Sequence, residues 1–394
     1  MQDLIPLYPL YQLLFEDHGL TPTEISTLFI IWSATAFLLE IPSGALADVF
    51  SRRKLLMLGP ALTGLGYAAW ITVPSYAAFA LGFILWGAGS ALISGTYEAF
   101  VYDELAARGT SGKYASLLGK ARSAALVANL TATLLAIPLF ALGGYLLVGF
   151  LSVLSCLAQL LVAASLPEAV RAVSADETDP EEADGGWRGA LQRYLAMLRA
   201  GLGEAATSRV VRRAVGLVAL LGGFLAFDEY FPLLARGVGA PTTLVPLLIA
   251  GTVAAQAIGG ALAGPAYRLP AAVFAVGLGA TAGLISWGSL SGTAAGFVPI
   301  ALGYGVMQLV IVVADARLQD AIEGPARATV TSVSGFFAEV FAVSVYAGFA
   351  LGAVWVSLPV LVAGLTVPVL LTALITPKAL PPPPEKESTH TTTP

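Results

Sequence analysis

Long apolar runs recur along most of the 394-residue chain, and short polar or Gly/Pro-bearing turns separate them. A helix needs about 20 apolar residues to cross the hydrocarbon core of a bilayer, and all but the first of the runs have roughly that length. The pattern therefore predicts an all-α membrane protein with twelve helices. The runs cover residues 4–15, 25–47, 55–73, 77–101, 116–139, 143–166, 215–234, 243–263, 271–290, 297–314, 330–348 and 353–375.

The first run, residues 4–15, is too short to cross a bilayer. Its 12 residues would extend about 18 Å as a helix, against about 30 Å for the hydrocarbon core. We expect a truncated first helix, so that the natural reading frame continues upstream with about 10–15 more apolar residues. The alternative is a short helix that enters the bilayer at residue 1.

The composition supports the membrane interpretation. Hydrophobic residues make up 57% of the chain, charged residues 11%, and the mean hydropathy is +0.81. Soluble domains carry about 25% charged residues, so a soluble fold is excluded. The 42 glycines suit close helix contacts in a bilayer.

Patterns for catalysis, nucleotides and metals are missing from the sequence. It holds no G-x-x-x-x-G-K-[ST] string for an ATP-driven pump. His18 and His390 are too far apart for a metal site, and the single Cys156 permits no disulfide framework. We expect no enzymatic activity, no cofactor and no nucleic-acid partner.

Two polar segments divide the chain. Residues 167–214 join an acidic linker to a basic amphipathic stretch from 187 to 213, which predicts a helix on the membrane surface or a plain solvated connector. Residues 377–394 are rich in Pro and Thr and predict a disordered tail. We therefore expect a first bundle over 1–166, a linker over 167–214, a second bundle over 215–376 and the tail.

The positions of the cations predict the topology. Lysine and arginine follow the even-numbered runs, as in Arg52, Arg53 and Lys54, whereas the opposite ends carry only Arg236 together with acids such as Glu24. Cations next to membrane spans favour the cytoplasmic side. We expect a multi-pass protein of the cytoplasmic membrane with both termini in the cytoplasm.

The turn after the second run resembles a known motif. A small-residue turn, one carboxylate and three cations follow Glu40, and this string is similar to the G-x-L-A-D-x-x-x-R-[RK] loop between helices 2 and 3 of major facilitator superfamily transporters. Ser51 stands where that family usually has Gly. The matching residues are Gly44, Leu46, Ala47, Asp48, Arg52 and Arg53. The resemblance implies a twelve-helix fold of two six-helix bundles related by pseudo-two-fold symmetry, and we expect a monomer in the lipid bilayer.

An internal repeat agrees with two related halves. The string from Gly44 to Arg52 aligns with 260–268 at a shift of 216 residues, and Gly87-Ala-Gly89 aligns with Gly303-Tyr-Gly305 at the same shift. Parallel repeats of this kind place the substrate site between the halves near the middle of the membrane.

The loop motif predicts a cytoplasmic gate. We expect Asp48 to lie against the start of the eleventh helix beside Arg327, where free backbone amides favour an anion. Arg52 is expected to reach Asp103 at the end of the fourth helix. Together these contacts would join the halves and favour the outward-facing state. The predicted gate comprises Gly44, Asp48, Arg52, Arg53, Asp103 and Arg327.

Ionisable residues within the apolar runs are candidates for proton coupling or buried ion pairs. Arg122 could pair with Glu98, or hold an anionic substrate, or modulate Glu98 as a proton carrier. Glu98 and Asp315 precede Asp103 and Asp320 by five residues and could belong to the gate. Glu339 has no cation nearby in the sequence. It predicts a proton carrier or, alternatively, a protonated carboxyl bonded to a Ser or Gln on another helix.

The seventh run contains the strongest candidates for a substrate wall. Asp228, Glu229 and Tyr230 follow one another before Pro232, and adjacent helix positions cannot face the same way, so at most one of the two acids can face a cavity. Tyr8 and Tyr11, which flank Pro9, are the expected counterparts in the first half.

Together these features predict a secondary transporter that works by alternating access. We expect proton-coupled export of a small hydrophobic or amphipathic molecule, because the cavity candidates are mostly aromatic or small. Uptake or facilitated diffusion of a sugar, nucleoside or organic acid is the alternative, and a membrane sensor without transport is a third. The helix-5 region around Pro138 only approximates the G-P-x-x-G-G signature of drug/proton antiporters, which weakens the export assignment.

Overall fold

The computed structural model describes residues 3–167, 208–322 and 327–383, together with positions 189, 192, 195, 196, 199 and 203. Within these ranges the structure describes the backbone but not the side chains at 41, 42, 44–49, 95, 111, 115, 122 and 327–329. Most of the predicted linker, including its amphipathic stretch, therefore lies outside the described residues, as does the tail from residue 384.

The described part of the chain is entirely helical, with no strand. Its main elements are α1 (Tyr11–Asp17), α2 (Pro22–Val49), α3 (Arg52–Thr72), α4 (Tyr76–Ala107), α5 (Tyr114–Ser165), α7 (Arg209–Gly223), the 3-10 helix η3 (Phe224–Tyr230), α8 (Phe231–Gly237), α9 (Val245–Ala266), α10 (Ala271–Leu290), α11 (Phe297–Ala321), α12 (Arg327–Gly352) and α13 (Leu358–Ala379).

Ten helical segments in the described residues are long and apolar enough to cross a membrane. One of them, α5, covers both the fifth and the sixth predicted run. Its backbone leaves the helical conformation at Gly143 and Gly144, and this break divides α5 into two crossings. Gly144 has φ 58° and ψ −154°, which only glycine adopts readily. With this break and the short α1, the twelve-segment pattern predicted from the sequence is confirmed.

Local capping explains where α2 and α3 begin. The Thr21 N–H donates to Glu24 Oε2 (2.8 Å) and the Glu24 N–H donates to Thr21 Oγ1 (3.3 Å), which is a reciprocal capping box ahead of Pro22. Ser51 accepts from the Lys54 N–H at 3.4 Å and caps α3. The turn between the two helices is therefore short, and the Ser51 departure from the family pattern is compatible with it.

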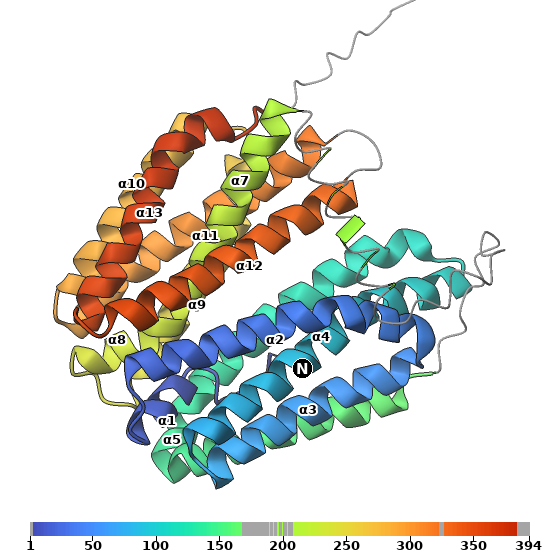
Figure 1. Ribbon diagram of the computed structural model, residues 1–394, viewed down its shortest axis with the longest axis horizontal. Coiled ribbons are helices and arrows are strands. Elements are labelled where there is room, and N and C mark those ends of the chain that lie inside the picture. Colours follow the sequence, from blue (N-terminus) through green and yellow to red (C-terminus); the bar gives the residue numbers. More distant parts are fainter. Residues whose placement is uncertain are drawn as a thin grey trace, which may run out of the picture.

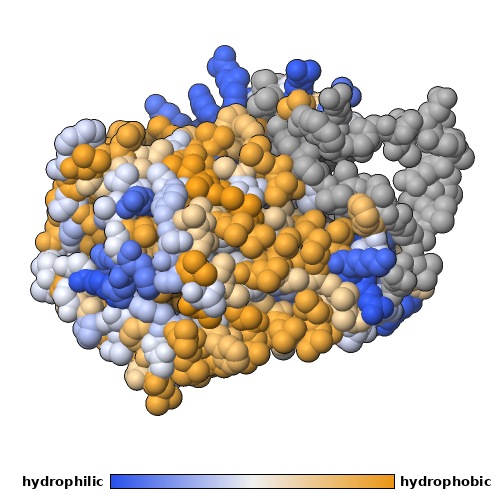
Figure 2. Space-filling model, turned by 60° about the horizontal axis from the view of Figure 1, so that its bottom comes forward, coloured by the Kyte–Doolittle hydropathy of each residue, from blue (hydrophilic) through white to orange (hydrophobic). Residues whose placement is uncertain are grey.

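The helices form two bundles (Figure 1). In the first, α3 packs on α4 and α5, and α2 packs on α4; in the second, α10 packs on α11 and α13, α9 on α11, and α12 on α7. The bundles meet where α12 lies against α2 and α5 against α9, with a smaller contact of α1 with α8. Figure 2 shows a broad apolar surface between hydrophilic clusters near two ends, as expected for a protein surrounded by lipid.

Glycine pairs allow equivalent helices to approach closely in both bundles. A Cβ on Gly89 would lie 2.6 Å from a carbonyl of α3, and one on Gly303 would lie 3.2 Å from a carbonyl of α10. Gly87 instead packs on α2, and Gly305 on α9. Since α10 and α9 are the counterparts of α3 and α2, Gly89 corresponds in packing to Gly303. The repeat is present, but the alignment of Gly87 with Gly303 at a shift of 216 is wrong.

Arg317 is buried in the second bundle, with 1% of its surface exposed. It follows the predicted run 297–314, but α11 continues to Ala321, so Arg317 lies within the helix. Its guanidinium donates to the carbonyls of Tyr267, Leu269 (2.7 Å) and Pro381 (3.1 Å), and it lies over the Phe274 ring at 5.3 Å. Arg317 thereby joins α11 to the turn after α9 and to the residues after α13. The chain is thus ordered as far as Pro381, beyond the predicted start of the tail at 377.

We expect Arg317→Met to destabilise the protein strongly. The variant removes the donor to three carbonyls, of which that of Pro381 is buried, and a buried acceptor left unpaired costs about 1–3 kcal/mol. The thermal unfolding midpoint of the purified protein in detergent should fall, whereas Arg268→Met, at an exposed neighbouring position, should leave it nearly unchanged. Equal midpoints for the two variants would contradict this assignment.

Candidate functional site

The two ends of the molecule differ in charge. We call the end with Arg52, Arg53 and Lys54 the basic side, and the end with Glu16, Asp17 and Glu24 the acidic side. Polar contacts between the bundles lie in layers from the acidic side inward, and a cavity follows on the basic side.

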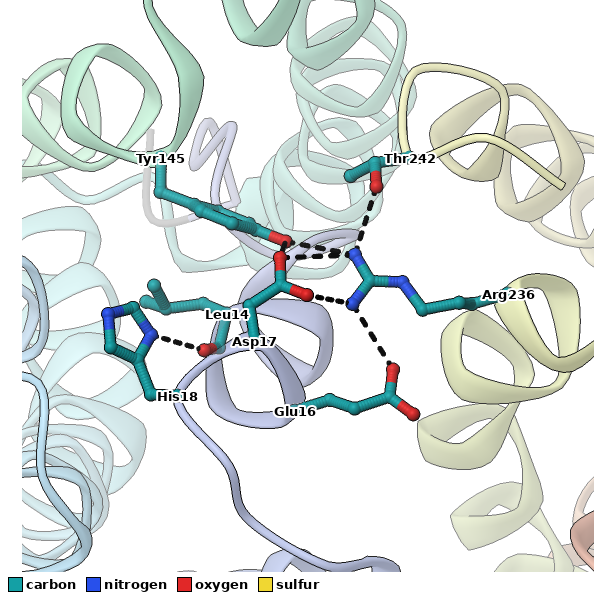
Figure 3. A network of polar contacts seen from close by, with 7 residues as sticks. All are labelled: Leu14, Glu16, Asp17, His18, Tyr145, Arg236 and Thr242. Carbon is teal, nitrogen blue, oxygen red and sulfur yellow. Dashed lines mark hydrogen bonds and ion pairs between the residues drawn. The ribbon is translucent and has the colours of Figure 1, made fainter. Parts of the chain in front are cut away.

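On the acidic side, Arg236 of α8 links the second bundle to the first (Figure 3). It donates to Glu16 (3.3 Å) and to Asp17 (3.2 Å), both at the end of α1, and to the hydroxyls of Tyr145 (3.2 Å) and Thr242 (2.9 Å). The Tyr145 hydroxyl in turn donates to Asp17 at 2.6 Å. We call this set the acidic-side latch. The sequence marked Arg236 only as the lone cation of an acidic face, and that signal would have sufficed to predict a pairing.

Two opposing effects act on the pKa of the Glu16 carboxyl in the latch. Burial raises its pKa, and the Arg236 guanidinium beside it acts in the opposite direction. Because the latch side chains stay 22–41% exposed, solvent screens each ion pair. The latch can therefore break and re-form at modest cost.

A second layer lies deeper, around Glu229. Its carboxylate accepts from the Tyr11 hydroxyl and from Gln12 Nε2 (2.9 Å), both on α1. Tyr230 donates to Ser26 of α2 at 2.8 Å and stacks on Phe349. These contacts bring predicted cavity residues together across the interface, although the packing there leaves them buried against one another.

The neighbouring acid, Asp228, faces the other way. It lies beside Tyr304 of α11, whose hydroxyl donates to the carbonyl of Leu225 (2.8 Å). The 3-10 helix η3 thus presents Glu229 to the first bundle and Asp228 to its own bundle. The two acids thus face different ways, and neither is among the residues that line the cavity on the basic side.

A cavity of about 460 Å³ opens between the bundles on the basic side of these layers. Helices α2 and α4 of the first bundle and α12 of the second form its walls. Its lining residues are Ala36, Phe37, Glu40, Ser90, Ala91, Ser94, Thr331, Ser332, Gly335, Phe336 and Glu339.

Glu339 lies at the deep end of this cavity and accepts a hydrogen bond from Ser33 of α2. The sequence had left open whether a Ser or Gln on another helix would hold this carboxyl, and the structure identifies Ser33. One helical turn nearer the basic side, Phe37 meets Phe336 edge to face at 5.4 Å. Helices α2 and α12 thus contact each other at Ser33–Glu339 and at Phe37–Phe336, and the cavity lies beside these contacts.

Of the predicted gate residues, Arg52 and Asp103 form the expected ion pair. Both belong to the first bundle, so this contact cannot hold the two bundles together. Arg53 lies in the first turn of α3. Gly44, Asp48 and Arg327 occupy the ends of α2 and α12, and their side-chain contacts lie outside the described part of the structure.

In the second half, a hydrogen bond takes the place of the Arg52–Asp103 ion pair. Asp320 accepts a hydrogen bond from the hydroxyl of Tyr267, the residue just before Arg268. Glu98 and Asp315 are exposed on α4 and α11. The predicted pairing of Glu98 with Arg122 cannot be followed, because the Arg122 side chain is not described.

Several further polar groups point into the interior without a partner in the described residues. They are Oε1 of Gln12, Nε1 of Trp32 and Oε1 of Gln308. Tyr8, a predicted cavity residue, stacks on Trp86 at 5.4 Å. Buried polar atoms are normally hydrogen-bonded, so these three stand out. Nothing in the sequence marks them, because neither Gln nor Trp is unusual in an apolar run.

Solved structures of known function share this fold. They include a mutant of the nucleoside transporter NupG (TM-score 0.68, 12% identity, 95% of each chain covered), a bacterial homolog of the human lysosomal transporter Spinster in an inward-facing, unoccupied conformation (0.65, 14%, 96% of this chain and 92% of that one), and a D-xylose-proton symporter (0.61, 14%, 96% and 94%). No curated protein matches the sequence.

The sequence itself matches the Major Facilitator Superfamily over residues 4–344. The match extends from α1 into α12 and so includes both bundles, the interface layers and the cavity between them. The chain has two helical bundles that meet around a cavity lined by Glu40 and Glu339. It belongs to the Major Facilitator Superfamily and is a multi-pass membrane transporter.

Proposed function

We propose that this transporter exports a small amphipathic molecule in exchange for protons across the cytoplasmic membrane. The observation that carries the proposal is Glu339, a carboxyl within a membrane helix that lines the cavity and accepts from Ser33 of the opposite bundle. An ionisable group at this position is costly to keep unless it serves transport.

The described conformation supports an assignment to one stage of the cycle. Contacts between the bundles are dense on the acidic side, and the cavity lies on the basic side. Cations near membrane spans favour the cytoplasm, so the basic side is proposed to be cytoplasmic, as are both termini. The cavity would then face inward, ready to receive cargo from the cell.

Proton coupling follows from the contacts of Glu339. An ionised Glu339 accepts from Ser33 and thereby holds α12 against α2. A proton on Glu339 removes its charge and weakens this bond, because hydrogen bonds to charged groups are about twice as strong as neutral ones. Release of the proton on one side and rebinding on the other would couple the rocking of the bundles to the pH difference.

The basic-side gate belongs to the same proposal. Asp48 and Arg327 would meet when the cavity closes on that side, with Arg52 held in place by Asp103. The linker, a monomeric state and the domain boundaries at 166, 214 and 376 also remain predictions.

A second candidate function is uptake of a nucleoside or sugar. The unpaired amide oxygens of Gln12 and Gln308 and the unpaired indole N–H of Trp32 would suit a cargo with many hydroxyl or ring-nitrogen groups. A substrate screen on purified protein in liposomes, with and without an imposed pH difference, tests both proposals. Flux that depends on the pH difference supports coupling, and the absence of flux for every compound class contradicts transport.

We expect Glu229→Gln and Asp228→Asn to differ in their effects. Glu229 binds Tyr11 and Gln12 across the interface, so its neutral variant should weaken the closed acidic side and reduce transport about tenfold. Asp228 faces its own bundle, and its variant should mainly lower the thermal unfolding midpoint. Transport rates and midpoints measured on the same preparations check this, and a reversed pattern would contradict the assignment of facing.

A further inference from the structure

The cavity on the basic side has a one-sided charge. Its lining includes two carboxylates, Glu40 and Glu339, and no lysine, arginine or histidine among the lining residues of the described structure. The two acids come from opposite bundles, since Glu40 is on α2 and Glu339 on α12. Because both line one cavity, each carboxylate lies in the electrostatic field of the other. Two like charges facing one cavity stabilise a positive guest and destabilise a negative one.

The two carboxylates lie at different depths. Ser33, which contacts Glu339, precedes Glu40 by seven residues on α2, or about 10 Å along the helix axis. Glu40 is exposed at the mouth, whereas Glu339 is half-buried at the deep end. A positively charged molecule that enters from the basic side would therefore meet Glu40 first and reach Glu339 second.

Aromatic and hydroxyl groups fill the space between the two acids. Phe37 and Phe336 line the cavity from opposite bundles, and their ring faces attract cations as well as apolar groups. Ser90 and Ser94 of α4 supply hydroxyls on the third wall. This combination suits a molecule with an apolar body and a positive charge better than it suits a sugar.

We propose that the cargo is an organic cation, with its positive charge held by Glu339 and its apolar body against the cavity-facing surfaces of Phe37 and Phe336. The inference rests on the proposed transport function and names its substrate class. A proton and the cation then compete for the Glu339 carboxylate, so that each proton bound releases one positive charge from the site. Because one carboxylate cannot hold both, binding of a proton at Glu339 is coupled to release of the cation.

Equilibrium binding to the purified protein in detergent tests the substrate class. The probes are phenyltrimethylammonium and tetraphenylphosphonium as small and large cations, and tetraphenylborate as an anion of the same shape as the large cation. Binding to protein-free micelles is subtracted. We expect saturable binding of at least one cation, and no saturable binding of tetraphenylborate when it is measured in a separate experiment without the cations.

Three Glu→Gln variants locate the charge. We expect Glu339→Gln to weaken cation binding about tenfold or more, because a hydrogen bond or contact to a full charge is lost. Glu40→Gln should weaken it less, since this side chain is exposed at the mouth. Glu24→Gln is the matched control on the acidic side, where Gln also suits the capping box, and should bind like the wild type.

The outcomes separate this inference from the transport proposal. Failure of both cations to bind saturably, or equally tight saturable binding of tetraphenylborate alone, would overturn the cationic cargo even if no variant folds. Unchanged affinity in folded Glu339→Gln protein would overturn the role of that residue. If wild-type protein binds a cation but moves none in liposomes, the cation site stands and transport fails. If it moves a neutral solute under a pH difference and binds no cation, transport stands and this inference is wrong.

Discussion

Replacing Glu339 with Gln is expected to abolish the dependence of transport on the pH difference. Gln keeps the shape and still accepts from Ser33, but it cannot bind and release a proton. Net flux in liposomes should become independent of the imposed pH difference, and counterflow of labelled against unlabelled substrate should persist at concentrations above the weakened dissociation constant. The loss should be close to complete, because no second carboxyl contacts Ser33 in the described residues.

Ser33→Ala is the matched control for this prediction. It removes the hydrogen bond between α2 and α12 and leaves the titratable group in place. Transport by Ser33→Ala should change in rate and keep its dependence on the pH difference. A wild-type pH dependence in Glu339→Gln would instead identify Glu339 as a structural acid and transfer the coupling role to Glu98 or Glu229.

Replacing Arg236 with Gln should open the acidic side. Each exposed ion pair contributes only about 0–1 kcal/mol, but Arg236 makes contacts to four side chains, and their joint loss should cost about 2 kcal/mol. This shifts the equilibrium between the two states more than tenfold. A cysteine at position 26, which is buried at the interface, should then react faster with a membrane-impermeant maleimide in a background where Cys156 is replaced.

Arg108→Gln is the control for the latch. Arg108 pairs with Glu104 within α4 and is 69% exposed, so its loss touches no contact between the bundles. Labelling at position 26 should be unchanged in this variant. Equal labelling rates in Arg236→Gln and the wild type would show that the latch does not hold the acidic side closed.

The sequence predicted the fold because the bilayer imposes a simple rule on it. Every spanning segment must satisfy its own backbone hydrogen bonds and present apolar side chains to lipid, so the runs of hydrophobic residues mark the helices directly. The predicted gap between the runs 116–139 and 143–166 even lies next to the break at Gly143 and Gly144 that divides α5. Helix facing is not encoded in this way, which is why the glycine alignment between the halves failed.

The candidate site could be predicted only in part. Glu339 and Glu229 stood out as acids in apolar surroundings, but their partners Ser33, Tyr11 and Gln12 lie more than 200 residues away in the chain. No local pattern connects them, since the contacts depend on how the two bundles meet. Arg317 lies outside the predicted run 297–314, because its burial depends on Tyr267 and Pro381, which are 50 and 64 residues away in the chain.

The bond from Arg317 to the Pro381 carbonyl has a practical consequence for work with this protein. Affinity tags and fluorescent fusions are commonly attached at the C-terminal end of transporters. A fusion joined after residue 383 keeps the carbonyl of Pro381 in place. A shortened chain that stops at Ala379 lacks this carbonyl and exposes the buried guanidinium of Arg317 to water. The choice of cutting point, more than the nature of the tag, should decide how much folded protein is recovered.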